Sequence, residues 1–403
     1  MFYKINKNKL IIVYDQILQS LLTFIITIFI TNYYGLSSLG NYHIFFSFLL
    51  FSNLICNSFS YEGFMIFYDR YKQNFITYNF LIIVIINLIF FILILIYFFQ
   101  LQKVNLDILV YFFLYSMSYN LKYLVKKIFI LKNLNITFFI SSTLYFLSSL
   151  FLLWLFIYIK IQDITNIFKY LIYGDLLFIL FLLCKDKLII RKLKFKYFLF
   201  FIKKFIKRNL KYLTAQLLGK SNIFIMPLLV VYYFDHETLG LLRLYISTFG
   251  FVFIVYQIFE NIYPLKFSKY SKESFKLKKL FYNHLTLNFI FIILIIVILK
   301  FFLDDIFQIL FGLNSLNYIF LFYGAAIIIL IEFFHLFFSF LLRVRNYINQ
   351  IILISFLHNF IFLLLVNIFF IYYGIIGYFI ASICSCIFFI NFYIIKSVNF
   401  FKF

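Results

Sequence analysis

The sequence has little of what a water-soluble protein needs on its surface. Only 12% of its 403 residues are charged, acidic residues number 14 against 36 lysines and arginines, and no long polar segment interrupts the chain. Hydrophobic residues make up 65%, whereas soluble domains have roughly 45–50%. Such an excess cannot be buried in a water-soluble core, so the sequence excludes a soluble domain of useful size.

Cysteines and nucleotide-binding motifs are also scarce. The four cysteines lie in or at the ends of apolar segments and are interpreted as small membrane hydrophobes, because a Cys-x-Cys pair alone is a weak metal or redox signal. The segment "LLGKS" at 217–221 ends like a phosphate-binding loop, but Thr214 stands where that loop requires glycine. We therefore expect no metal, no nucleotide and no other cofactor.

What the sequence does have is long, continuous apolar runs. Strands of a membrane barrel would alternate apolar and polar residues over about ten positions, whereas these runs reach the roughly 20 residues that a spanning helix needs. The sequence therefore predicts an all-α polytopic membrane protein with about twelve transmembrane helices. The predicted spans are 10–34, 40–67, 78–100, 108–131, 136–159, 168–184, 212–234, 240–264, 281–303, 318–342, 351–373 and 374–395.

The net charge of +22 is distributed unevenly along the chain. Most lysines and arginines lie at the two termini and in the connections that follow even-numbered spans. Because cytoplasmic loops of membrane proteins are enriched in these residues, both termini are predicted to be cytoplasmic. The basic charge then reflects topology and attraction to anionic lipid, and we expect no nucleic-acid partner.

The longest basic segment divides the chain in two. Residues 185–211 mix lysines, arginines and aromatic residues, a pattern typical of an amphipathic segment that lies along the inner membrane surface. The sequence thus predicts an N-terminal lobe of six helices over 1–184, a linker over 185–211 and a C-terminal lobe of six helices over 212–403.

A short turn recurs in the two predicted lobes. The segment "YYGLSSLGNY" at 33–42 and the segment "YFDHETLGLL" at 233–242 are 200 positions apart, and Gly40 aligns with Gly240. Both lobes would start in the cytoplasm, so the two lobes are predicted to form a parallel pseudo-repeat. Internal repeats are common in transporters, where the substrate site lies between them.

The residues of these turns resemble a known family. The segments "ITNYYGLSSLGNYHIFFSF", "VVYYFDHETLGLLRLYISTFGF" and "YYGIIGYFIAS" look like those of Wzx-type polysaccharide flippases, members of the multidrug/oligosaccharidyl-lipid/polysaccharide (MOP) exporter superfamily. The resemblance extends over the whole chain in helix number, repeat and turns.

This resemblance implies a function without bond-making chemistry. It implies a flippase of the bacterial inner membrane that moves undecaprenyl-diphosphate-linked oligosaccharide by alternating access, for O-antigen or capsule assembly. The implied partners are membrane lipid, H⁺ or Na⁺ as a coupling ion, and the polymerase and chain-length proteins of that process. We expect a monomer, because each lobe completes the other.

Polar residues inside the predicted spans are the candidate site residues, because a charge near the bilayer centre costs about 2.5–3.5 kcal/mol. Cations and amides would bind the diphosphate and sugar by charge-assisted and neutral hydrogen bonds: Lys220, Arg243, Lys122, Asn57, Gln216 and Gln257. Titratable groups would couple transport to ions: Asp15, Glu62, Glu260, Glu332, His335 and Asp175. Alternatively, these groups pair to lock helices together, or extend toward the membrane surface where they lie near helix ends.

Two other functions stay open at this stage. An ion-coupled multidrug exporter of the same superfamily would favour a cavity with acids and few cations. A membrane O-antigen polymerase would need a large outer loop with arginines, and the longest outer connection, about 304–317, is short and lacks them. The sequence therefore favours a flippase.

Overall fold

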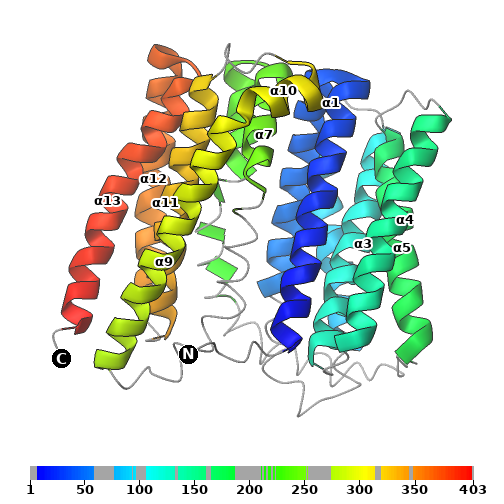
Figure 1. Ribbon diagram of the computed structural model, residues 1–403, viewed down its shortest axis with the longest axis horizontal. Coiled ribbons are helices and arrows are strands. Elements are labelled where there is room, and N and C mark those ends of the chain that lie inside the picture. The colour runs from blue at the N-terminus through cyan, green and yellow to red at the C-terminus, as the bar shows by residue number, and fades with distance from the viewer. Residues whose placement is uncertain are drawn as a thin grey trace. The chain divides into compact units, whose positions relative to one another are not determined.

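The computed structural model describes residues 7–58, 77–92, 94–96, 106–131, 135–159, 165–186, 210, 213–214, 217–218, 221–222, 224–250, 252, 274–313, 319–344 and 348–401. Within these residues nearly every position is helical and no strand occurs (Figure 1). The prediction of an all-α fold is therefore confirmed.

The chain forms two compact units. Unit 1 comprises Met1–Leu22 and Ile44–Leu217, and unit 2 comprises Thr23–His43 and Leu218–Phe403. The first helix contributes to both. The predicted lobe boundaries stay a prediction, and most of the basic linker lies outside the described residues.

The labelled helices are α1 (Lys7–Cys56), α3 (Leu106–Leu131), α4 (Asn135–Tyr158), α5 (Thr165–Asp186), α7 (His236–Thr248), α9 (Ser274–Phe301), α10 (Leu303–Phe311), α11 (Ile319–Val344), α12 (Ile348–Tyr373) and α13 (Ile376–Phe401). Most of the labelled helices have the length of a membrane span, whereas α7 and α10 are short, with 13 and 9 residues. A further span occupies Thr77–Ile96. In unit 1, α3 packs on α4 and α5; in unit 2, α13 packs on α11 and α12.

Many large apolar side chains point away from the protein. On α9, for example, Leu287, Ile290 and Leu294 are each more than half exposed. Such surfaces would aggregate in water, but they are the expected solvent-facing side of a helix whose solvent is lipid. Within the described residues, five helices are long and apolar enough to cross a membrane.

The first helix contains the first copy of the repeated turn. Gly35 has a left-handed backbone (φ 81°) and interrupts α1 between the predicted spans 10–34 and 40–67. A residue with a Cβ pays a steric cost in that conformation, which glycine avoids. The predicted turn is therefore present, although helical residues continue on both sides of it.

The two copies of the turn pack against each other within unit 2. A Cβ added to Gly40 would overlap the main-chain carbonyl of His236, and a Cβ added to Gly240 would overlap the main-chain carbonyl of Leu36. Gly40 and Gly240 are 200 positions apart, and so are their contact partners, Leu36 and His236. Each turn therefore contacts the other in the same way, and the contact has pseudo-two-fold symmetry. The sequence repeat thus corresponds to a physical contact that requires glycine on both sides.

The second copy begins with a capped helix. The Asp235 side chain accepts a hydrogen bond from the Thr238 backbone N–H (2.7 Å) and caps the N-terminus of α7. This hydrogen bond favours the carboxylate and holds the pKa of Asp235 below its usual value. The cap fixes where α7 starts and so places Gly240 in its second turn.

We predict that Gly40→Ala and Gly240→Ala each destabilise the protein by about 1–3 kcal/mol, the usual cost of overpacking. The added methyl group would meet main chain, which cannot rotate aside as a side chain can. Thermal unfolding of the detergent-purified protein measures the effect. Gly250→Ala is the matched control, because among the described residues nothing beyond its chain neighbours and its own helix backbone lies within 4 Å of its added Cβ. Full stability in both test variants would contradict the close contact.

We predict that Asp235 makes stability depend on pH. Because its folded pKa is below the unfolded value, the cap stabilises the protein above the unfolded pKa, near 3.9, and this stabilisation is lost as the pH falls through the folded pKa. Asp235→Ala should cost about 0.5–2 kcal/mol at neutral pH. Asp235→Asn should keep the cap, but its unfolding temperature should fall less than that of the unaltered chain as the pH is lowered through the acid range. An equal fall in both proteins would refute the role of Asp235 in the pH dependence.

Candidate functional site

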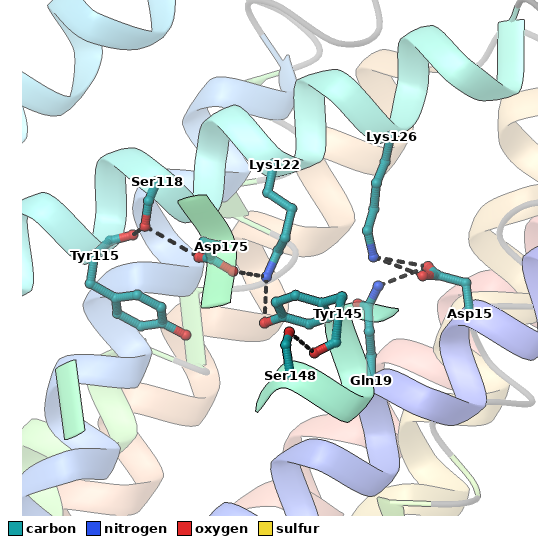
Figure 2. A network of polar contacts seen from close by, with 9 residues as sticks. All are labelled: Asp15, Gln19, Tyr115, Ser118, Lys122, Lys126, Tyr145, Ser148 and Asp175. Carbon is teal, nitrogen blue, oxygen red and sulfur yellow. Dashed lines mark hydrogen bonds and ion pairs between the residues drawn. The ribbon is translucent and has the colours of Figure 1, made fainter. Parts of the chain in front are cut away.

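The candidate site is a buried network of charges in unit 1. Helix α3 carries Ser118, Lys122 and Lys126 at four-residue spacing, which places all three on one face. That face is covered by α4 and α5, and Asp15 of α1 contacts it through Lys126. Figure 2 shows Lys122 pointing toward Asp175 and Tyr145, and Lys126 pointing toward Asp15.

The first ion pair joins α3 to α5. The Lys122 Nζ donates to Asp175 Oδ1, and it also donates to the Tyr145 hydroxyl of α4 at 2.9 Å. Ser118 Oγ donates to the other oxygen of Asp175 at 3.2 Å. The Lys122 ammonium lies 4.4 Å from the centre of the Tyr145 ring and 4.8 Å from that of Tyr119. Both charged side chains are almost fully buried.

The second ion pair joins α3 to α1, one helical turn away. Lys126 Nζ donates to both carboxylate oxygens of Asp15, at 2.9 and 3.1 Å. Ser142 Oγ donates to Oδ1 at 2.7 Å, and Gln19 Nε2 donates to Oδ2 at 2.8 Å. The pair is also buried, with side-chain exposures of 6% and 5%.

The network is electrically balanced. Two lysines face two aspartates, and Lys122 is influenced electrostatically by Asp175, Lys126 and Asp15. A lone buried charge is far more costly than a paired one. Each lysine of the site is therefore retained by its carboxylate, and the ammonium groups become available to an anion only when a carboxylate is released.

A second, uncharged cluster lies in the same unit. Asn87 Oδ1 accepts hydrogen bonds from Ser52 (3.0 Å), Ser116 (2.8 Å) and Asn120 (3.0 Å). Asn53 of α1 donates to Asn120 Oδ1 at 3.0 Å. Four of these residues are buried, and they tie α1 and α3 to the span 77–96. The sequence shows these polar residues inside apolar runs, but it does not reveal that they meet, because they are scattered over three spans.

Unit 2 holds a smaller group of titratable side chains. The rings of His335 and His358 are nearly parallel with centroids 6.4 Å apart, and the Phe389 ring packs on both. His358 Nε2 lies 3.3 Å from Ser385 Oγ and 3.4 Å from Cys386 Sγ. The sequence indicated His335 as a site residue, whereas Cys386 was expected to be only a small hydrophobe.

The predicted site residues lie in different parts of the structure. Asp15, Lys122 and Asp175 come together in the network of unit 1. Arg243, Glu332 and His335 lie in unit 2, where Arg243 follows Gly240 by one turn and interacts electrostatically with Tyr42. Asn57 is half-buried and directly follows α1. The remaining candidates lie outside the described residues: Lys220, Gln216, Gln257, Glu62 and Glu260.

We predict that the Lys122–Asp175 pair is a strongly coupled structural unit. Asp175→Asn or Lys122→Met leaves one uncompensated buried charge and should each cost about 3–5 kcal/mol, whereas the double variant should lose clearly less than the sum. Thermal unfolding in detergent of the unaltered chain, the two single variants and the double variant measures the coupling energy of this double-mutant cycle. Lys169→Met is the control, since Lys169 is a half-buried lysine that stacks on the Tyr111 ring. Strict additivity would mean that the two charges do not interact.

Comparison with known proteins identifies the fold. No family model and no curated protein matches the sequence. Among solved structures, an inward-facing multidrug resistance MATE transporter of the MOP superfamily matches with a TM-score of 0.71 and 11% identity, over 95% of this chain and 96% of that one. The lipid II flippase MurJ matches at 0.64 and 17% identity, over 97% and 87%. The MATE multidrug transporter DinF-BH matches at 0.67 and 14%, over 99% and 97%.

These likenesses extend over nearly the whole chain. Because the sequence identities are low, the likenesses show a shared fold and nothing more. The expected fold class, an all-α membrane protein of about twelve helices in two halves, is confirmed by them. The chain is thus a multi-pass membrane protein with the fold found in transporters of the MOP superfamily.

Proposed function

We propose that this chain is a Wzx-type flippase that moves an undecaprenyl-diphosphate-linked oligosaccharide across the bacterial inner membrane. The observation that carries the proposal is the pair of lysines, Lys122 and Lys126, buried one turn apart on a membrane helix. Buried ammonium groups are costly in a membrane and are commonly functional. A diphosphate is an anion that two such groups bind well by charge-assisted hydrogen bonds.

The fold supports a transport function of this kind. MurJ, which has the same fold, is described as a lipid II flippase, and the fold neighbours are transporters rather than enzymes. Alternating access would move the sugar head group through the protein while the lipid tail stays in the bilayer. Bond-making chemistry is not required, and among the described residues no cluster of metal-ligating side chains is present.

In the proposed cycle, the aspartates keep the lysines in place when no cargo is bound. Asp175 and Asp15 compensate the two ammonium groups, and an incoming diphosphate would replace them. The tyrosines beside Lys122, Tyr119 and Tyr145, are of the type that stacks on sugars and donates to their hydroxyl groups. Arg243, Glu332 and His335 would serve cargo binding or ion coupling in unit 2, with H⁺ or Na⁺ as the coupling ion.

The setting of the proposed function follows from the charge distribution. Both termini would lie in the cytoplasm, by the enrichment of lysine and arginine in the connections on that side. Anionic lipid would bind the basic connections, and a polymerase and chain-length proteins would take over the product for O-antigen or capsule assembly. We propose that the chain works as a monomer.

A second function is favoured by a specific observation. The network of unit 1 has as many carboxylates as lysines, so it has no excess positive charge. A multidrug exporter of cationic compounds would need such carboxylates, and DinF-BH, with the same fold, is described as a multidrug transporter. The cargo, lipid-linked sugar or cationic drug, distinguishes the two functions.

We predict that deleting the gene in its host traps complete lipid-linked oligosaccharide units on the cytoplasmic face of the inner membrane. The measurement labels the lipid-linked sugar pool and tests its accessibility from each face. Complementation with Lys122→Gln should restore little export, whereas Lys169→Gln, a matched lysine variant of the same unit, should restore it, at equal protein levels in the membrane.

Other outcomes would reject the flippase. A normal sugar pool together with increased sensitivity to cationic dyes would identify a multidrug exporter. Complete units that reach the outer face without being polymerised would point to a polymerase instead.

A further inference from the structure

The network of unit 1 raises the question of which cation its carboxylates can bind. A buried aspartate in a membrane protein is a common site for a transported or coupling ion. Hard cations such as sodium bind carboxylate, carbonyl and hydroxyl oxygens. Asp15, with Ser142 and Gln19 beside it, has oxygen atoms of these types at hand. Whether a sodium ion fits depends on what already occupies the carboxylate.

The acceptor positions of Asp15 are all occupied by donors from this chain. An ionised carboxylate has about four lone-pair sites. Oδ1 accepts from Lys126 and Ser142, at 2.9 and 2.7 Å, and Oδ2 accepts from Lys126 and Gln19, at 3.1 and 2.8 Å. A sodium ion would have to displace at least one of these donors to reach either oxygen.

The donor that contacts both oxygens is itself a cation. Lys126 Nζ bridges the carboxylate of Asp15 at the position that a bound monovalent cation would take. Its side chain is 6% exposed, and Nζ lies 5.4 Å from the centre of the Phe178 ring, which stabilises a cation further. Lys122 adds a second positive charge nearby. Sodium would therefore meet repulsion and filled coordination positions.

We propose that Lys126 is a tethered substitute for a bound metal cation at Asp15, so that this site excludes sodium and Lys126 determines that specificity. A related arrangement occurs at Asp175, where Lys122 donates to one carboxylate oxygen and Ser118 to the other. The inference concerns the binding of an ion to unit 1 and does not depend on the cargo of the proposed function.

Removing the charge of Lys126 should allow Asp15 to bind sodium. In Lys126→Met, Asp15 becomes a buried carboxylate without a counter-charge, with the Ser142 hydroxyl and the Gln19 side-chain amide still beside it. The probe is sodium itself. The detergent-purified full chain is assayed for bound radioactive sodium and for thermal unfolding in sodium, potassium or choline chloride at equal ionic strength, because a ligand that binds only the folded state raises its unfolding temperature.

We expect no saturable sodium binding at Asp15 in the unaltered chain. Lys126→Met should bind sodium saturably, on the order of tenfold above the background of the unaltered chain, with a sodium-specific rise in unfolding temperature. Asp15→Asn/Lys126→Met should lose both effects, because the carboxylate is gone. Lys169→Met, which alters a lysine of the same unit, should behave as the unaltered chain. If Lys126→Met does not fold, Lys126→Gln is assayed in its place.

Two results would overturn the proposal. Saturable sodium binding by the unaltered chain that Asp15→Asn abolishes would show that Lys126 does not exclude the ion. No sodium binding in a folded Lys126 variant would show that this lysine is not what determines the specificity. Neither result bears on the cargo, which the sugar-pool experiment in cells tests separately.

Discussion

The absence of water around the membrane-embedded side chains is the constraint on which the rest of the structure depends. A charge in this environment must find its counter-charge inside the protein. In unit 1 that requirement brings Lys126 to Asp15 and Lys122 to Asp175, and the remaining acceptor positions of Asp15 are taken by Ser142 and Gln19. Because these bonds join α1, α3, α4 and α5, the same interactions that make the charges tolerable also set how four helices meet.

The internal repeat has a comparable physical basis in unit 2. Two short turns, 200 residues apart, cross so closely that each needs a glycine opposite the other's main-chain carbonyl. A shared ancestry of the two halves would give similar turns, but only the close crossing explains why Gly40 and Gly240 in particular occur in both. The cap at Asp235 and the left-handed Gly35 set the positions of the helices on either side of this crossing.

The charges that suggest a function are also the ones that hold the helices together. A structural ion pair and a cargo-binding lysine place opposite demands on a side chain, since the first must stay and the second must be released. An ion pair can satisfy both demands when a strong ligand competes for the lysine. The free-energy cost of leaving the aspartate without its lysine is then offset by the bond between the lysine and the ligand. A diphosphate is such a ligand for an ammonium group, whereas a sodium ion competes only for the carboxylate.

Local signals in the sequence, continuous apolar runs and punctuating glycines, were enough to predict the all-helical membrane fold, the turn at Gly35 and the repeated turn. The sequence also singled out Asp15, Lys122 and Asp175, because a charge inside an apolar run is visible without a structure. It did not reveal that Lys126 pairs with Asp15, because a lysine near the end of an apolar run can equally extend toward the membrane surface. Pairing depends on which faces of α1, α3, α4 and α5 meet, and residues more than 100 positions apart, such as Asp15 and Lys126, are brought together by packing alone. The amide cluster around Asn87 and the contact of His358 with Cys386 were decided by tertiary structure for the same reason.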